Sequence, residues 1–194
     1  QRQMCIRDSI HDVFVEKLVA ATAELKMGNG LDEGVQQGPL VNEKAVEDVD
    51  RLVRLSTDAG AQVALGGARS DLGPCYYQPT VLTAVTSEMA VFRNEIFGPV
   101  APVMSFADEA EAIALANDTE FGLASYFYTR DIGRVWRVSE ALDYGMVGVN
   151  EGIISNEMAP FGGVKASGSG REGSKYGIDD YLEIKYILMG GLDR

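Results

Sequence analysis

PFGGVKASGSGREGSKYG, residues 160–177, is the most informative stretch of this chain. Its backbone is rich in glycine, and glycine lets a segment approach a ligand or another backbone closely because it carries no Cβ atom. A flexible solvent loop is typically built from Ser, Gly and polar residues, without the buried-type Phe and Val found here. The stretch therefore predicts a shaped wall that opens at Pro160-Phe161 and closes at Arg171-Glu172.

The composition predicts an acidic globular protein. The chain has 194 residues, a net charge of −12, 46% hydrophobic residues and 24% charged residues. The acidic surface disfavours nucleic acid and anionic membranes as partners, and no apolar run approaches membrane-spanning length. Two cysteines, Cys5 and Cys75, are too few for a disulfide framework and favour a reducing compartment, so we expect a cytoplasmic protein.

Residues 1–9, QRQMCIRDS, share neither the alternation nor the periodicity of the chain from Ile10 onward. They resemble the translated adapter read-through that occurs at the ends of environmental sequence fragments. We therefore interpret residues 1–9 as a non-native tail and exclude them from the expected fold.

From Ile10 onward, helical periodicity alternates with short apolar runs, which indicates an α/β layer architecture with parallel strand pairing. Asn42 and Asp131 are expected N-caps, Val46, Val49 and Val53 an expected buried stripe, and Trp136 a packing residue. Helices are expected at 10–27, 43–59, 108–117 and 132–142, and strands at 61–65, 77–84, 99–106, 124–128 and 146–149. No linker in this range indicates a domain boundary.

The tail YLEIKYILM, residues 181–189, predicts a strand that is apolar on both faces. Such a strand at a chain end promotes aggregation unless another strand pairs with it. It can complete a sheet in another subunit or be the last strand of its own sheet, and the sequence favours neither.

Two motifs suggest ligand chemistry, and we reject one of them. Residues 168–173, GSGREG, match the GxGxxG dinucleotide fingerprint, but no strand immediately precedes them and no βαβ unit comes after them. Residues 94–99, NEIFGP, are more promising, because a carboxylate at Glu95 can accept two hydrogen bonds from vicinal hydroxyls such as those of ribose, and Phe97 can pack against a flat heterocycle. An exposed glutamate between a helix and a strand explains the same residues.

No catalytic or metal-binding set is visible in the sequence. His11 is the single histidine, and with two scattered cysteines it provides no metal ligand set. Cys75, in the turn GPCYYQP, is better explained as a half-buried small side chain than as a nucleophile.

Read together, NEIFGP at 94–99 and PFGGVKASGSGRE at 160–172 closely resemble the carboxy-terminal half of the aldehyde dehydrogenase superfamily. The resemblance extends from Ile10 to Leu192, and segments such as YFYTRDIGRVWRVSEAL are most similar to succinate-semialdehyde dehydrogenases. It implies an α/β, Rossmann-like catalytic domain of the aldehyde dehydrogenase fold, in its C-terminal portion. We expect residues 10–182 to belong to this partial domain and residues 183–194 to form a terminal oligomerisation strand.

The resemblance also implies roles for single residues. Glu95 matches the residue that holds the nicotinamide ribose of NAD or NADP, and Phe97 the one that packs near the nicotinamide. Phe161 matches the aromatic residue that lines the aldehyde tunnel. Ser155 matches the residue that contacts the substrate carboxylate.

The family's reactive groups have no match in this chain. The nucleophilic Cys of the resembled enzymes lies sixteen positions before the residue that matches Phe14, upstream of position 1, and Cys5 falls at another offset. The general-base Glu, the oxyanion-hole Asn and the dinucleotide-binding units also match nothing here. Family chemistry runs through thiolate attack, hydride transfer to the nicotinamide and thioester hydrolysis, so we expect no catalytic residue in this chain and no activity without the upstream half.

Three functions therefore stay open. The first is a fragment of an NAD(P)-dependent succinate-semialdehyde dehydrogenase that forms homo-oligomers. The second is the same fragment of a glutarate-semialdehyde or other aldehyde dehydrogenase, because one methylene changes recognition only slightly. The third is a non-catalytic partner that joins full-length dehydrogenases through its last strand.

Overall fold

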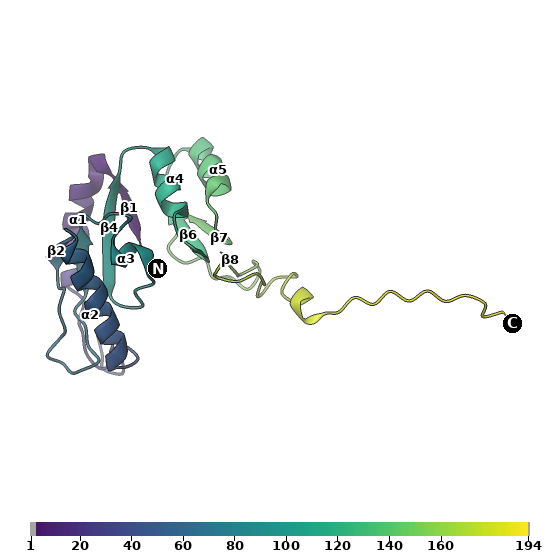
Figure 1. Cartoon of the computed structure of the whole chain (residues 1–194), viewed down its shortest axis with the longest axis horizontal. Coiled ribbons are helices and arrows are strands. Elements are labelled where there is room, and N and C mark those ends of the chain that lie inside the picture. The colour runs from purple at the N-terminus through teal and green to yellow at the C-terminus, as the bar shows by residue number, and fades with distance from the viewer. Residues whose placement is uncertain (1–2, 194) are drawn as a thin grey trace. The chain divides into compact units, whose positions relative to one another are not determined.

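The computed structural model describes residues 3–193, which form two compact units, one up to Asp118 and the other from Thr119 onward (Figure 1). No Pro- or Gly-rich linker marks this boundary in the sequence. The division therefore reflects the contacts within each unit rather than a change in composition.

The first unit is built on a four-stranded sheet in the order β1-β4-β3-β2. β1 and β3 both run parallel to the central strand β4, whereas β2 pairs antiparallel with β3. The strands are β1 (Met4–Arg7), β2 (Gln62–Leu65), β3 (Thr80–Thr83) and β4 (Val100–Phe106), and the helices are α1 (Asp8–Ala23), α2 (Glu43–Asp58), α3 (Ala90–Arg93) and α4 (Glu109–Asn117). The expected alternation of helices and strands is confirmed. The expected parallel pairing is confirmed for β1-β4 and β3-β4 and is wrong for β2-β3.

Helices cover both faces of this sheet. Leu82, Val100 and Met104 point to the face where α2 supplies the main hydrophobic core. Val81 and Val103 are also fully buried, and because neighbouring strand residues point to opposite faces they lie on the other side, where α1 contacts β3 and β4. This layering is the α/β arrangement expected from the sequence.

The prediction for α2 is confirmed at its N-terminus and along its buried stripe. Asn42 adopts an extended conformation and its Oδ1 accepts a hydrogen bond from the Ala45 amide at 2.8 Å, as an N-cap does. The expected stripe of Val46, Val49 and Val53 is buried, together with Leu52 and Ser56.

Removing this cap tests the local account. Asn42→Ala leaves a helix amide without its acceptor, so we expect the free energy of unfolding of the first unit to fall by about 1 kcal/mol. Urea denaturation followed by hydrogen exchange in α2 measures this loss, and Asn42→Asp, which keeps a capping oxygen, is the matched control. A midpoint for Asn42→Ala equal to that of the unsubstituted chain would contradict the assignment.

The predicted helix at 10–27 ends four residues too late. α1 ends at Ala23, because the backbone beyond it pairs with a later segment of the chain. The Lys26 carbonyl accepts from the Gln36 amide at 2.9 Å, and the Gly28 amide donates to the Gln37 carbonyl at 3.1 Å. A tertiary pairing outweighs helical periodicity at this point.

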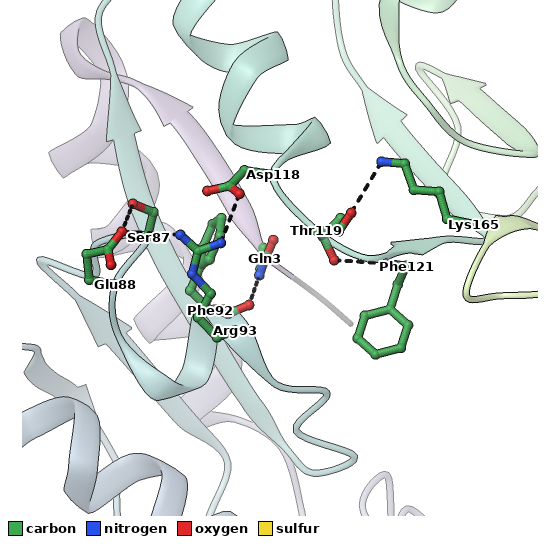
Figure 2. Close-up of polar contacts among 9 residues, drawn as sticks. All are labelled: Gln3, Ser87, Glu88, Phe92, Arg93, Asp118, Thr119, Phe121 and Lys165. Atoms are coloured by element: carbon green, nitrogen blue, oxygen red, sulfur yellow. Dashed lines mark hydrogen bonds and ion pairs between the residues drawn. The ribbon is translucent and has the colours of Figure 1, made fainter.

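The exclusion of residues 1–9 from the fold is wrong for the part that the structure describes. Met4–Arg7 form β1, in register with Val103–Phe106 of β4, and α1 begins at Asp8. Gln3 donates a side-chain hydrogen bond to the Phe92 carbonyl (Figure 2). Met4, Cys5 and Ile6 are apolar enough to occupy a strand position beside β4. Residues 1 and 2 lie outside the described residues, and the non-native origin of the stretch stays a prediction.

The described part of the second unit, residues 119–193, contains two two-stranded sheets and one α-helix of ten residues. β6 (Ala124–Phe127) pairs parallel with β7 (Met146–Val149), and β5 (Phe121–Gly122) pairs antiparallel with β8 (Val164–Lys165). α5 (Ile132–Ala141) connects β6 to β7, and its expected N-cap Asp131 accepts from the Gly133 amide at 2.8 Å. Trp136 is 65% exposed, so its assignment as a packing residue is wrong for this chain. The apolar spacing of this helix also predicts burial of Val135, Val138 and Leu142; Val138 and Leu142 are buried, and Val135 is only partly buried.

The tail forms no strand within this chain. A single 3-10 turn, η1 (Asp179–Tyr181), precedes residues 182–190, which have no regular secondary structure and are all exposed, Ile184 to 99%. Of the two expectations for 181–189, a last strand in its own sheet is therefore wrong. Pairing with another subunit stays a prediction.

Candidate functional site

The turn at residues 94–99 is held rigidly in the first unit. Ile96 is buried in the core cluster, so its neighbours Glu95 and Phe97 project outward on either side of it. The Asn94 side chain donates to the Ala90 carbonyl at 2.9 Å, and the Pro99 carbonyl accepts from the Thr80 amide at 2.8 Å. Glu95 is partly exposed, which leaves its carboxylate available to a ligand.

The conformation of Phe97 is unusual. Its φ is +47°, in the left-handed region that non-glycine residues rarely adopt, and its side chain is 81% exposed. The next residue, Gly98, lies against Val49, because a Cβ atom at Gly98 would approach Val49 Cγ2 to 2.5 Å. Residues in such sparsely populated backbone conformations cluster at active sites and ligand clamps.

Arg93, just before this turn, ties the end of α3 to two carboxylates of the same unit. Its guanidinium lies 2.9 Å from Asp118 and 3.2 Å from Glu88 (Figure 2). These ion pairs are partly exposed, so each contributes little stability by itself. The buried side chain of Ile96, rather than these surface ion pairs, holds the turn against the core.

The glycine-rich stretch forms a folded loop in the second unit, as the sequence predicts. Phe161 and Glu172 exchange two backbone hydrogen bonds, at 2.9 and 2.7 Å, so the opening and closing ends of the loop are paired. Lys165, at the end of β8, donates to the Thr119 carbonyl at 3.3 Å, while Thr119 Oγ1 accepts from the Phe121 amide at 3.2 Å (Figure 2). Phe161 is half-buried in this arrangement.

The folded loop borders an open groove of about 790 Å³ within the second unit. Phe161, Arg171 and Asp180 are among its lining residues, and much of its remaining wall is glycine backbone. The shaped wall inferred from composition is thus present as a groove with an aromatic side chain at its edge. The GSGREG residues at 168–173 belong to this wall and do not open onto a helix, in agreement with rejection of the dinucleotide fingerprint.

Ser155 lies in an exposed segment, residues 151–160, between β7 and the loop, and is not among the residues that line the groove. Asn150 anchors the start of this segment. Its side-chain amide donates to the Thr129 carbonyl at 2.8 Å and its Oδ1 accepts from the Thr129 amide at 2.9 Å, while its φ is +56°. Asparagine tolerates this left-handed conformation better than most residues.

Cys5 lacks the environment of a reactive cysteine. Burial, and secondly the negative charge of Glu111, raise the pKa of its thiol to about 11. The thiol is therefore protonated at neutral pH, and the thiolate is the form that attacks electrophiles.

The described part of the chain also gathers no group of three metal-binding side chains. Among the same residues, no helix is both long and apolar enough to cross a bilayer.

The sequence predicts Glu95 and Phe97 as cofactor contacts and Ser155 and Phe161 as substrate contacts. The structure adds the residues that support them. These are Gly98 behind the first turn, and Asn150, Arg171 and Asp180 around the second-unit loop. Gly98 and Arg171 lie within the two motifs singled out in the sequence, 94–99 and 160–177, whereas Asn150 and Asp180 lie outside them. The supporting contacts join residues far apart in the chain and have no pattern of their own.

Residues 1–187 match the model of the aldehyde dehydrogenase family. The chain belongs to the aldehyde dehydrogenase family. Its mixed α/β architecture is therefore the aldehyde dehydrogenase fold, and the resemblance read from the two motifs is confirmed.

Curated relatives cover almost the whole chain. The 3-sulfolactaldehyde dehydrogenase of Pseudomonas putida is 58% identical over 97% of the chain and 39% of its own length. The glutarate-semialdehyde dehydrogenase of Pseudomonas aeruginosa is 56% identical over 98% of the chain and 39% of its own length. Succinate-semialdehyde dehydrogenase (NADP(+)) of Escherichia coli is 55% identical over 97% of the chain, again with 39% of its length covered. The chain thus spans about two-fifths of these aldehyde dehydrogenases.

Solved structures of the family agree closely with this one. The succinate-semialdehyde dehydrogenase of Burkholderia pseudomallei superposes with a TM-score of 0.93 at 55% identity, covering 95% of this chain and 38% of that one. Betaine aldehyde dehydrogenase of Staphylococcus aureus, in complex with NAD+, gives 0.89 at 36% identity, covering 93% and 37%. The fold of this aldehyde dehydrogenase segment is shared across members with different named substrates.

Proposed function

We propose that this chain is the C-terminal portion of an NAD(P)-dependent aldehyde dehydrogenase that oxidises short aldehydes bearing a second, anionic group, with succinate semialdehyde as the first candidate. The relatives at 55–58% identity are named for succinate semialdehyde, glutarate semialdehyde and 3-sulfolactaldehyde. Each of these aldehydes carries a carboxylate or a sulfonate. The overall reaction converts aldehyde, NAD(P)+ and water into carboxylate, NAD(P)H and protons.

The turn at 94–99 carries this proposal, because its two outward side chains fit a nicotinamide nucleoside. The Glu95 carboxylate can accept hydrogen bonds from two vicinal ribose hydroxyls, and the exposed Phe97 ring offers an apolar surface to a flat heterocycle. The buried Ile96 and the close Gly98–Val49 approach keep the backbone that carries both side chains in place without the ligand. The bound cofactor accepts the hydride, and this chain's part is to hold and orient it.

Substrate recognition is assigned to the second unit. Phe161, half-buried at the edge of the groove, would line the path of the aldehyde. Ser155, exposed on the segment anchored by Asn150, would donate a hydrogen bond to the anionic end of the substrate. A hydroxyl donor suits a carboxylate at either chain length, so glutarate semialdehyde is the nearest alternative substrate.

The exposed apolar tail supports a further element of the proposal, assembly into homo-oligomers. Within residues 3–193, the tail at 182–190 pairs with no strand, and the side chains of Ile184, Tyr186 and Leu188 are exposed on alternate positions. Pairing with a sheet of another copy would cover them. The same feature would let the chain join a full-length dehydrogenase as a non-catalytic partner, which is the second candidate function.

The test joins the chain to the upstream polypeptide of its own gene, a protein that we call the completed enzyme. We expect the completed enzyme to reduce NAD(P)+ with succinate semialdehyde and the chain alone to give no reduction, because the motif resemblance assigns the family's nucleophile and general base to the upstream polypeptide. The absorbance of reduced nicotinamide measures both. NAD(P)H formation by the chain alone, or a completed enzyme that is inactive on all three anionic aldehydes, would overturn the proposal. A gene that begins next to Ile10 would favour the non-catalytic partner.

A further inference from the structure

The glycine-rich loop consists of two facing stretches, residues 160–164 and 168–173, held together at several points. The paired amides of Phe161 and Glu172 form one link. The stretches also approach closely, since a Cβ atom at Gly162 would lie 2.3 Å from the Gly170 carbonyl oxygen. The position of Phe161 therefore depends on what holds the second stretch.

Arg171 is the one side chain among the described loop contacts that bonds to both stretches. Its Nη1 donates to the Gly163 carbonyl at 2.8 Å, two residues beyond Phe161, and to the Gly170 carbonyl at 2.9 Å. The Arg171 amide donates in turn to Asp180 Oδ2 at 3.0 Å, which ties the loop to the η1 turn. A guanidinium stays charged and rigid, so its donors hold their directions.

We call the hydrogen bonds of Arg171 to Gly163, Gly170 and Asp180 the Arg171 brace. Two glycines beside this brace leave no room for a Cβ atom. A Cβ atom at Gly162 would come within 2.8 Å of Arg171 Cδ, and one at Gly170 within 2.5 Å of Asp180 Oδ2. The arginine stem and the aspartate thus fill the space that the missing side chains leave. The loop is shaped around these two side chains rather than being slack.

We propose that Arg171 is a positioning residue that fixes Phe161, and with it the width of the aldehyde path; this assignment rests on the proposed function. Arg171 acts through the backbone of Gly163 and the Phe161–Glu172 pair, and its Nη1 hydrogen bonds are made to backbone carbonyls. Loss of these hydrogen bonds should therefore weaken the binding of any aldehyde that passes Phe161, whether charged or neutral. If Arg171 instead bound the anionic group of the substrate directly, its loss would weaken the binding of anionic aldehydes alone.

The first experiment needs no activity and uses the chain itself. We expect Arg171→Ala to speed hydrogen exchange at the Phe161 and Glu172 amides by about tenfold, because two charge-assisted hydrogen bonds are lost. The Ala166 amide, bonded to the Glu120 carbonyl at 2.9 Å in the same unit, is the internal reference. Arg130→Ala, which removes an exposed arginine outside the loop, is the matched control. Unchanged exchange at Phe161, or equal acceleration at Ala166, would overturn the proposal.

The second experiment measures kinetics in the completed enzyme with succinate semialdehyde and with butanal, a neutral aldehyde of the same length. For Arg171→Ala we expect KM to rise about tenfold for both aldehydes with kcat changed less, and Arg171→Lys to recover part of the loss. A rise in KM for succinate semialdehyde but not for butanal would overturn the role of Arg171 as a positioning residue. If the unsubstituted completed enzyme oxidises neither aldehyde, the proposed function fails, while the exchange experiment still decides the brace.

Discussion

Glu95→Gln in the completed enzyme will lower turnover by about 10- to 100-fold, because hydrogen bonds to a charged acceptor are worth roughly 1.5–3 kcal/mol and glutamine keeps only one neutral acceptor oxygen. The cofactor would remain bound through its other contacts but sit less firmly over the reacting carbon. Hydride transfer depends steeply on such alignment. The effect should therefore fall on kcat and on the KM for NAD(P)+, and leave the KM for the aldehyde close to its original value.

Glu88→Gln is the matched control for this prediction. Glu88 lies in the same unit and pairs with Arg93 at 3.2 Å on the surface, where an ion pair contributes little. The control should keep nearly full turnover, and both variants should unfold at the same urea concentration as the parent protein. Steady-state kinetics with varied NAD(P)+ measures the difference. Equal turnover in Glu95→Gln and Glu88→Gln would remove Glu95 from the cofactor site.

Gly145→Ala will destabilise the second unit by about 3 kcal/mol, the upper end of the usual overpacking effect. A Cβ atom at Gly145 would lie 2.0 Å from the Gly162 carbonyl oxygen and 2.9 Å from Gly163 Cα. Both of these are backbone atoms, so no side-chain rotation relieves the collision. The substitution must push away the segment that carries Phe161.

Gly152→Ala provides the comparison, because the nearest atom to its added Cβ is Tyr128 Oη at 3.9 Å. Hydrogen exchange across a urea series measures both variants, with peptides of the second unit reporting the effect and peptides of α2 serving as the internal standard. Gly152→Ala should change little. If the second unit unfolds at the same urea concentration in Gly145→Ala and in Gly152→Ala, the close approach of residues 145 and 162 is not present in solution.

Local chemistry made α2 and α5 predictable. Asn42 and Asp131 have short side chains that accept hydrogen bonds from nearby helix amides, and the valine spacing in α2 places one stripe toward the sheet. Both signals act within a few residues, so they are visible in the sequence. The same holds for the shaped character of residues 160–177, which results from glycine combined with buried-type residues.

Features that depend on distant partners were missed. α1 ends at Ala23 because Lys26 and Gly28 bond to residues 36–37, and residues 4–7 become a strand because β4 is available beside them. Trp136 is exposed although its neighbours Val138 and Leu142 are buried. The apolar spacing of α5 indicates a buried face at Val138 and Leu142, and Trp136 lies outside that face.

The candidate site divides in the same way. Residue chemistry suggests Glu95 and Phe97 as cofactor contacts, the resemblance between motifs supports them and adds Ser155 and Phe161, and the family membership behind that resemblance is confirmed. The left-handed Phe97, the Asn150–Thr129 pair and the Arg171 brace depend on three-dimensional contacts. They explain how exposed segments can hold defined positions.

A crystal structure of the completed enzyme with NAD(P)+ and a bound anionic aldehyde analogue tests the central claim most directly. We expect the Glu95 carboxylate within hydrogen-bonding distance of both hydroxyls of the nicotinamide ribose, and Phe161 and Ser155 in contact with the analogue in the same cleft. Glu95 and Phe161 on opposite sides of the enzyme, or a cofactor held without Glu95, would contradict it.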